Sequence, residues 1–333
     1  MTAVTEIQFA AFVATIGRGP GRSRALTRQE AETAFGMVLR GEADPHQVGA
    51  FLMLLRFRGE DPDEITGIVQ AARLHARLGR HDLPHPDLNV DLDWPSYGAG
   101  RTRGAPWFLL AALALARTGV RILMHGSNDF SAGITVEAAL TALGRHPAAS
   151  LADAAGTLAT TNFAYLPLRA MAPDLDRLLD MRRLFGLRSP VNTAARLLNP
   201  ADAPAGVDGV FHPPYIDVHL GVAERMGRPR LLVLKGGGGE AERVPIKPAT
   251  AAIWDQATGR RDLALPAIQG LRPHNPADDT PGACAAVWSG ENTPETPLAT
   301  IQATIALALL ALGRTNDPTQ AMADAASIWA QRH

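Results

Sequence analysis

The chain has 333 residues, of which 46% are hydrophobic and 20% are charged, and its formal net charge is −1 at pH 7. This length exceeds one ordinary hydrophobic core and predicts a large domain beside a smaller one. The near-zero net charge excludes a global attraction to nucleic acid or to acidic membranes, so any basic surface must be local.

The cysteine content and the lengths of the apolar runs indicate in which compartment of the cell the protein lies. The single cysteine, Cys284, excludes an internal disulfide framework and is typical of a reducing environment. The N-terminal segment has no basic residue ahead of its apolar stretch, and the apolar run 305–312 is too short to span a bilayer. We therefore expect a cytoplasmic protein that makes no membrane contact.

Helix-start signals recur through the first 80 residues. They are a capping box at Thr27 and Glu30 and two capping aspartates, Asp44 and Asp61, each followed by proline. Apolar residues recur at helical spacing between these signals. Residues 1–80 are therefore predicted to be an all-helical domain, too small to be independent and joined by helices near 170–195.

Residues 81–333 are predicted to form a large α/β domain with a mostly parallel central sheet. Buried-strand patterns alternate with helical patterns, which favours a parallel sheet covered on both faces. The expected strands are 88–93, 120–124, 162–166, 230–234, 251–255 and 262–265, and the expected helices are 106–117, 135–143, 173–185, 215–226, 294–312 and 318–331.

Glycine-bearing turns follow three of the predicted strands, at 97–100, 125–128 and 236–239. Ligands of open α/β sheets bind beyond the carboxyl ends of strands, where backbone N–H groups and helix N-termini attract anions. The anion candidates are Tyr97, Gly98, Gly100, Arg101, Arg103, His125, Gly126, Ser127, Asn128, Lys235 and Gly236, and the metal candidates are Glu240 and Glu242. The alternative is ordinary loop geometry, since short βα loops use glycine without any ligand.

Several stretches resemble one enzyme family. Residues 182–192, RRLFGLRSPVN, are similar to the R-x-L-G-x-R-T-x-F-N stretch of anthranilate phosphoribosyltransferases, and residues 198–200 match the Leu-x-Asn-Pro that follows it. Residues 26–58 resemble the helical N-terminal domain of that family. The resemblance implies the family's fold, which is also that of class II nucleoside phosphorylases, with phosphoribosyl pyrophosphate bound between the domains. It also implies a homodimer formed through the helical domain.

The resemblance is incomplete at the family's site residues. The family's first turn reads Gly-Thr-Gly-Gly-Asp, whereas residues 94–101 here read WPSYGAGR. Met124 stands in place of a lysine, and Ala241 in place of the aspartate of a metal-holding Asp-Glu pair. Three lost charge-assisted hydrogen bonds would cost about 4–9 kcal/mol. The comparison implies a degenerate site without anthranilate transferase activity, in which Mg²⁺ is expected only if phosphoribosyl pyrophosphate binds.

A YbiB-type subgroup of the same superfamily is more similar still. Its signatures resemble DWPSY at 93–97, LRSPV at 187–191, FHP at 211–213 and KG at 235–236. The resemblance implies a homodimer that binds nucleic acid without sequence preference. The acceptor or nucleic-acid candidates are Arg182, Arg183, Arg188, Asn192 and His212, with Arg18, Arg22, Arg24 and Arg28 extending a basic track. Trp94, Tyr97, Trp107 and Tyr165 are candidates for stacking on bases, although a place in the core is preferred for Trp107 and Tyr165. The alternative for the arginines is pairing with carboxylates.

Two other functions stay open. One is a phosphoribosyltransferase, transferring a pentosyl group to an unidentified aromatic or nitrogenous acceptor, which the glycine-bearing turns favour. The other is a scaffold that binds a protein partner. His125 and His212 are predicted to line a pocket, with hydrogen bonding to a turn as the alternative, and no catalytic residue is assigned.

Overall fold

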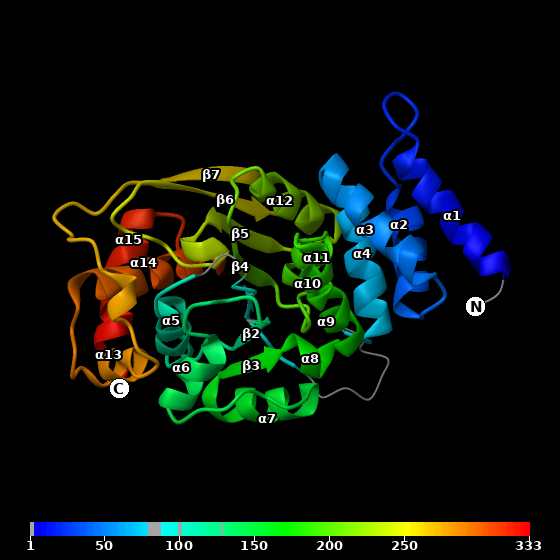
Figure 1. Ribbon diagram of the computed structural model, residues 1–333. Coiled ribbons are helices and arrows are strands. Elements are labelled where there is room, and N and C mark those ends of the chain that lie inside the picture. Colours follow the sequence, from blue (N-terminus) through cyan, green and yellow to red (C-terminus); the bar gives the residue numbers. More distant parts are fainter. Residues whose placement is uncertain (1–2, 79–87, 99–101, 128) are drawn as a thin grey trace.

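The computed structural model describes residues 3–78, 88–98, 102–127 and 129–333, and it places a helical unit beside an α/β unit (Figure 1). The helical unit comprises α1 (Ala3–Gly17), α2 (Arg28–Leu39), α3 (Pro45–Arg58) and α4 (Pro62–His75). Side chains of Thr27, Asp44 and Asp61 accept hydrogen bonds from backbone N–H groups of the first turns of α2, α3 and α4. The predicted caps therefore begin these helices, because each satisfies an otherwise unpaired donor.

A seven-stranded sheet forms the centre of the α/β unit, in the order β3-β2-β1-β4-β5-β6-β7. The strands from β3 to β5 are parallel, and β6 and β7 add an antiparallel edge. The strands are β1 (Leu92–Ser96), β2 (Ile122–Gly126), β3 (Phe163–Pro167), β4 (Ala205–Val210), β5 (Arg230–Lys235), β6 (Ala249–Asp255) and β7 (Gly259–Leu265). This arrangement confirms the predicted mostly parallel sheet, although β4 was not expected from the sequence.

Helices cover both faces of the sheet, as Figure 1 shows. Successive side chains of a strand point to opposite faces, so Ile122 and Met124 join the core beneath α5 and α14, while Leu123 joins the core on the other face. The remaining helices are α5 (Trp107–Ala116), α6 (Val136–Ala142), α7 (Leu151–Thr161), α8 (Leu168–Met171), α9 (Pro173–Asp180), α10 (Arg182–Phe185), α11 (Val191–Arg196), α12 (Tyr215–Arg225), α13 (Ala283–Ser289), α14 (Glu295–Ala311) and α15 (Pro318–Ala330), with short 3-10 turns at Gly237–Gly239 and Pro276–Asp278. Among the described residues, no helix is both long and apolar enough to cross a membrane.

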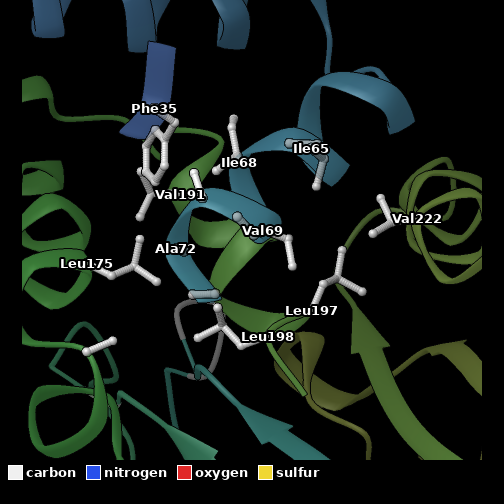
Figure 2. Close-up of a cluster of buried hydrophobic side chains, with 14 of the residues drawn as sticks. Phe35, Ile65, Ile68, Val69, Ala72, Leu175, Val191, Leu197, Leu198 and Val222 are labelled. Atoms are coloured by element: carbon white, nitrogen blue, oxygen red, sulfur yellow. The ribbon is translucent and has the colours of Figure 1, made fainter. Parts of the chain in front are cut away.

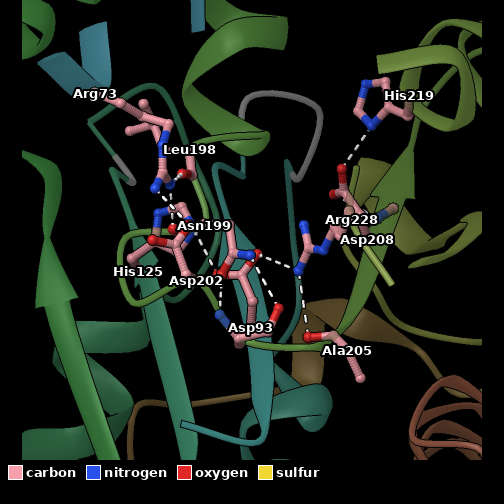
Figure 3. A network of polar contacts seen from close by, with 12 residues as sticks. Arg73, Asp93, His125, Leu198, Asn199, Asp202, Ala205, Asp208, His219 and Arg228 are labelled. Carbon is pink, nitrogen blue, oxygen red and sulfur yellow. Dashed lines mark hydrogen bonds and ion pairs between the residues drawn. The ribbon is translucent and has the colours of Figure 1, made fainter. Parts of the chain in front are cut away.

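The helical unit and the α/β unit share one hydrophobic core. Figure 2 shows Phe35, Ile68 and Val69 of α2 and α4 packed among Leu175 and Val191 of α9 and α11. A polar contact reinforces this boundary, because the guanidinium group of Arg73 on α4 donates to the carbonyl oxygens of Leu198 and Asn199 and pairs with Asp202 (Figure 3).

The strand order creates a crevice. From β1 the chain proceeds to β2 and β3 on one side and then crosses to β4 on the other side of β1. At such a switch point the connections leave the sheet in opposite directions, and the carboxyl ends of the two central strands are left open to a ligand. The end of β4 therefore marks where a site is expected.

Candidate functional site

A cavity of about 310 Å³, termed the boundary pocket, lies where α3 and the α10–α12 region meet the carboxyl end of β4. Polar side chains dominate its lining. They include Arg56 and Glu60 from the end of α3, Arg182, Arg188 and Arg196 from the α10–α11 region, and His212 after β4. The pocket thus occupies the crevice that the strand order predicts.

The boundary pocket gathers positive charge. Four arginines line it together with a single carboxyl group, that of Glu60. Burial lowers the pKa of Arg188, and the nearby charges of Arg182, Arg196 and Arg56 lower it further. Guanidinium groups that perturb one another in this way create a strongly positive local potential, which an anion entering the pocket would relieve.

In the inner part of the pocket, the carboxyl group of Glu60 is hydrogen-bonded to the phenol of Tyr215. The hydroxyl of Tyr215 donates to Oε1 of Glu60 at 3.2 Å and accepts a hydrogen bond from Nη1 of Arg56 at 2.9 Å. Burial raises the pKa of Glu60, against the opposing effect of Arg56 and of the Thr193 and Tyr215 hydroxyls. Burial and the carboxylate of Glu60 together raise the pKa of Tyr215 to about 12.

A buried histidine completes the inner wall. His219 on α12 lines the pocket, and its Nδ1 lies 2.6 Å from Oδ2 of Asp208 on β4. Asp208 also accepts hydrogen bonds from the backbone N–H of Gly209 at 2.7 Å and from Nη1 of Arg196 at 3.4 Å. An ionised carboxylate only accepts, so Nδ1 carries a proton and Nε2 is the second polar atom of the ring.

Behind the pocket lies a second, enclosed network, shown in part in Figure 3. The hydroxyl of Tyr97 is 3.0 Å from Nδ1 of His125, Nε2 of His125 is 3.2 Å from Oδ1 of Asp93, and Arg228 donates to Oδ2 of Asp93 at 2.9 Å. Burial disfavours the charge on Asp93, but Arg228 and His125 hold its pKa below the usual range. Arg196 joins the two networks by donating to the backbone carbonyl of Tyr97 at 3.3 Å.

This enclosure corrects part of the sequence prediction. Tyr97 and His125 have almost no exposed surface, so neither lines an open pocket; both are held inside by hydrogen bonding to each other. Trp107 and Tyr165 are buried in the core, as preferred from the sequence; Trp94 is buried as well, so the alternative that these rings stack on bases is wrong. The aromatic side chain at the mouth of the pocket is instead Phe211, which is 45% exposed and lies 5.9 Å from the guanidinium of Arg188.

A second cavity, of about 440 Å³ and termed the glycine-turn cavity, lies between the start of α5 and the turn that follows β5. Arg103, Gly237, Gly238 and Glu242 line it. The backbone N–H of Phe108, in the first turn of α5, donates to Oε2 of Glu242 at 3.0 Å. A helix N-terminus attracts anions, and here the chain's own carboxylate occupies that position.

Two glycines of the predicted anion turns have a packing role. A Cβ atom on Gly126 would lie 1.6 Å from the carbonyl oxygen of Ser96, and one on Gly236 would lie 1.6 Å from that of Glu240. Glycine is required at both positions because backbones approach this closely. At these positions ordinary loop geometry explains the glycine without a ligand.

The structure divides the other candidates. Arg182, Arg188, Asn192 and His212 come together in the boundary pocket. Arg183 points elsewhere and pairs with Asp180, and Lys235 is exposed at the end of β5. Other candidates lie half-buried or buried beside the turns (Ser127, Gly98 and Glu240) or outside the described residues (Gly100, Arg101 and Asn128).

The described residues offer poor ligands for a metal ion. Among the described residues, no three histidine, cysteine, aspartate or glutamate side chains lie close enough together to hold a metal ion. Glu242, one of the two predicted metal ligands, is bound to the N-terminus of α5, and Glu240 is buried. Magnesium prefers several oxygen ligands in octahedral geometry, so the residues present do not fit this ion.

Several pocket residues were not singled out in the sequence, among them Arg56, Glu60, Arg196, Tyr215 and His219. One of them, His219, could have been recognised from the sequence. His219 interrupts the apolar face of α12 formed by Ile216, Leu220 and Ala223, and a histidine at such a position requires a buried polar partner.

Comparison with known proteins gives the family. Residues 15–76 match the glycosyl transferase family, helical bundle domain. An anthranilate phosphoribosyltransferase of Moorella thermoacetica is 30% identical over 313 residues, which cover 91% of this chain and 89% of that protein.

Solved structures of the same enzyme share the fold. The anthranilate phosphoribosyltransferase of Thermus thermophilus has a TM-score of 0.75 and 24% identity, covering 97% of this chain and 94% of that one. The enzyme of Saccharomyces cerevisiae, in complex with PRPP and magnesium, also has a TM-score of 0.75, at 17% identity, covering 98% of this chain and 94% of that one. With its helical bundle and its near full-length similarity, the chain belongs to the anthranilate phosphoribosyltransferase family.

Proposed function

We propose that this chain is a nucleic-acid-binding member of its family, without anthranilate transferase activity, and that it acts as a homodimer. The observation that carries the proposal is the gathering of Arg56, Arg182, Arg188 and Arg196 in one pocket at the carboxyl edge of the sheet. Arginines bind backbone phosphates without regard to sequence. The exposed ring of Phe211 beside Arg188 offers a surface on which an unpaired base can stack.

The glycine-turn cavity supports the loss of the parent activity. The carboxylate of Glu242 already accepts the backbone N–H of Phe108 at the N-terminus of α5. A diphosphate at this position would meet like charge instead of a free donor, which is unfavourable in a partly buried site. Met124, which replaces the family's lysine, is fully buried and supplies no compensating charge. We infer that the phosphoribosyl pyrophosphate site is degenerate.

The surface of the helical unit supports a homodimer. Ile7, Phe57 and Leu74 expose large apolar side chains on α1, α3 and α4, and Phe57 is 88% exposed. Association through these helices would remove apolar area from water. Sedimentation of the wild type and of Phe57→Ser tests this, with a dimer expected for the former and a weakened dimer for the latter. A wild-type monomer at all concentrations would contradict the homodimer.

Fluorescence anisotropy with labelled single- and double-stranded DNA tests nucleic-acid binding. Affinity for single strands should fall with salt, with a slope of about −0.7 per neutralised phosphate. Arg188→Met should weaken binding and reduce the slope by about one contact. Arg177→Met is the matched control, because Arg177 is exposed on α9 and pairs with Asp174 outside the pocket. Absence of binding at low salt, or affinity indifferent to salt, would overturn the proposal.

A second candidate is phosphoribosyl transfer to an aromatic or nitrogenous acceptor. The proximity of Arg103 and the glycine-bearing turn in one cavity favours it. Calorimetry with magnesium and phosphoribosyl pyrophosphate separates the two functions. Tight binding that Arg103→Met weakens would support the transferase, whereas absent binding would exclude it.

A further inference from the structure

We propose that the boundary pocket takes the end of a nucleic-acid strand and binds its terminal phosphate monoester. This inference rests on the proposed nucleic-acid binding, and it names the part of the strand that enters the pocket. Phosphates within the strand contact the rim of the pocket and the surface around it, without regard to sequence. The closed inner end of the pocket, its excess of guanidinium groups and its size support this assignment.

The described lining residues form a pocket that is exposed at one end and closed at the other. Leu187, Phe211 and His212 are exposed at the mouth, where Arg188 lies over the ring of Phe211. Thr193 and His219 line the inner end and are buried. A strand that passes through a site needs an entrance and an exit, whereas the end of a strand needs only an entrance. The shape therefore favours a terminal group over an internal one.

The arginines of the pocket approach from different elements. Arg56 is on α3, Arg182 on α10, Arg188 after α10, and Arg196 on α11. A phosphodiester within a strand offers two unesterified oxygens and a single negative charge. A terminal monoester offers three such oxygens and, near neutral pH, between one and two negative charges. Guanidinium groups that converge from several directions are therefore matched more fully by the monoester.

Arg56 is the arginine placed to bind this group inside the pocket. Its Nη1 donates to the Tyr215 hydroxyl at 2.9 Å, and that hydroxyl in turn donates to Glu60 at 3.2 Å. The other guanidinium nitrogens of Arg56 donate to no described residue and keep accessible surface at the pocket. The guanidinium group is thus held in one orientation while donors remain for a phosphate oxygen.

The carboxyl group of Glu60, the only one among the described lining residues, does not cancel this positive charge. Its Oε1 is hydrogen-bonded to Tyr215, and its Oε2 has almost no accessible surface. Burial raises the pKa of Glu60, which favours its neutral form. Even when Glu60 is ionised, four guanidinium groups face one carboxylate. A phosphate that enters the pocket therefore meets an excess of positive charge.

The volume limits the occupant. At about 310 Å³ the pocket lies at the lower end of the usual range for small-molecule sites, about 300–1,000 Å³. A terminal phosphate with its sugar can enter, but a duplex cannot. The exposed ring of Phe211 then lies at the mouth, where it can stack on an unpaired base of the same strand. The preferred ligand is thus a single strand that ends in a phosphate.

Fluorescence anisotropy with single-stranded DNA that is labelled at an internal position tests the site, because both ends stay unmodified. One sequence is compared with a 5′-phosphate, with a 3′-phosphate, with hydroxyls at both ends, and with a 5′-phosphate blocked as its methyl ester. A terminal monoester should raise the affinity about 10- to 100-fold over hydroxyl ends, as one or two hydrogen bonds to a charged group imply. The 5′ and 3′ forms show which end enters. The methyl ester, which lacks one charge and one free oxygen, should lose most of the gain.

The outcomes with the wild-type protein separate the two proposals. Failure of every form to bind at low salt would reject nucleic-acid binding itself. Salt-dependent binding of equal strength by phosphate-ended and hydroxyl-ended strands would reject the strand-end site and leave the proposed function standing. A closed circle of the same single strand has no end and should bind no better than the hydroxyl-ended form. A circle that binds as tightly as the phosphate-ended form would also reject the strand-end site.

Variants of Arg56 assign the contact. Arg56→Met should lower the affinity for the phosphate-ended strand more than that for the hydroxyl-ended strand, so that the ratio of the two falls toward one. Arg56→Lys keeps the charge but not the fork of donors and should keep part of the ratio. Arg177→Met, whose ion pair with Asp174 lies outside the pocket, should leave the ratio unchanged. Each ratio compares two ligands on one protein, so partial unfolding does not change it; a wild-type ratio in Arg56→Met would contradict the assignment.

Discussion

Replacing Arg228 by methionine should be severely destabilising. Arg228 is buried, and it donates to Oδ2 of Asp93 at 2.9 Å and to the carbonyl oxygen of Ala205 at 3.2 Å. Methionine fills similar space but leaves the carboxylate of Asp93 buried beside His125 alone. Removing one partner of a buried ion pair typically costs about 3–5 kcal/mol. We expect a loss of that size in the free energy of unfolding of Arg228→Met near neutral pH.

The pH dependence of this loss follows from Asp93. The folded-state pKa of Asp93 is lowered, so its contribution to stability is present above the unfolded pKa, about 3.9, and is lost as pH falls through the folded value. Without the guanidinium group of Arg228, Asp93 gains a proton more readily. The difference in stability between wild type and Arg228→Met should therefore narrow as the pH falls, and the narrowing should begin above the unfolded pKa of Asp93, where the variant first takes up the proton.

Urea unfolding followed by circular dichroism measures both effects. Arg225→Met is the matched control, because Arg225 forms a partly exposed ion pair with Asp63 at 2.6 Å and should contribute at most about 1 kcal/mol. The double variant Asp93→Asn with Arg228→Met should recover part of the loss, since no buried charge remains. Equal losses in Arg228→Met and Arg225→Met, or a difference that widens in acid, would refute the reasoning.

Two further predictions concern the candidate turns. Glu242→Gln weakens the hydrogen bond to the backbone N–H of Phe108 at 3.0 Å and should destabilise the fold by about 1.5–3 kcal/mol. The control is Glu137→Gln, which breaks a half-exposed ion pair with Arg169 and should cost under about 1 kcal/mol. Equal urea midpoints for the two variants would contradict this prediction. Gly126→Ala should cost about 1–3 kcal/mol or more because its Cβ would lie 1.6 Å from a backbone oxygen, whereas Gly156→Ala, which meets open space on α7, should stabilise by about 0.5–1 kcal/mol. Thermal melting compares the two alanine variants, and a stable Gly126→Ala protein would contradict the packing role.

Local signals account for the part of the fold that the sequence predicts. The caps at Thr27, Asp44 and Asp61 act within four residues, and the apolar strand at 120–124 is recognisable without its neighbours. β4 is different. Its sequence, AGVDGV, has two glycines and a charged residue, so it lacks both alternation and an apolar run. Pairing with β1 and β5 makes it a strand, and such pairing is not encoded locally.

The site was predicted less completely than the fold. Arg182, Arg188, Asn192 and His212 were identified because they stand in motifs, and the structure brings them together. The contact between Glu242 and the N-terminus of α5 joins residues 134 positions apart, so no spacing in the sequence reveals it. Glycine-bearing turns were ambiguous for a physical reason, because glycine serves both anion binding and close backbone packing.

The clamp formed by Arg73 has a kinetic consequence. One guanidinium group holds the carbonyl oxygens of Leu198 and Asn199 and the carboxylate of Asp202, so separating the helical unit from the α/β unit would break all three contacts together. Hinge opening across this boundary is therefore disfavoured, and the pocket between the units is already shaped before a ligand arrives. Association should then be a single step, whose observed rate rises linearly with ligand concentration and reaches no plateau. Differences in affinity among ligands should appear mainly in their dissociation rate constants.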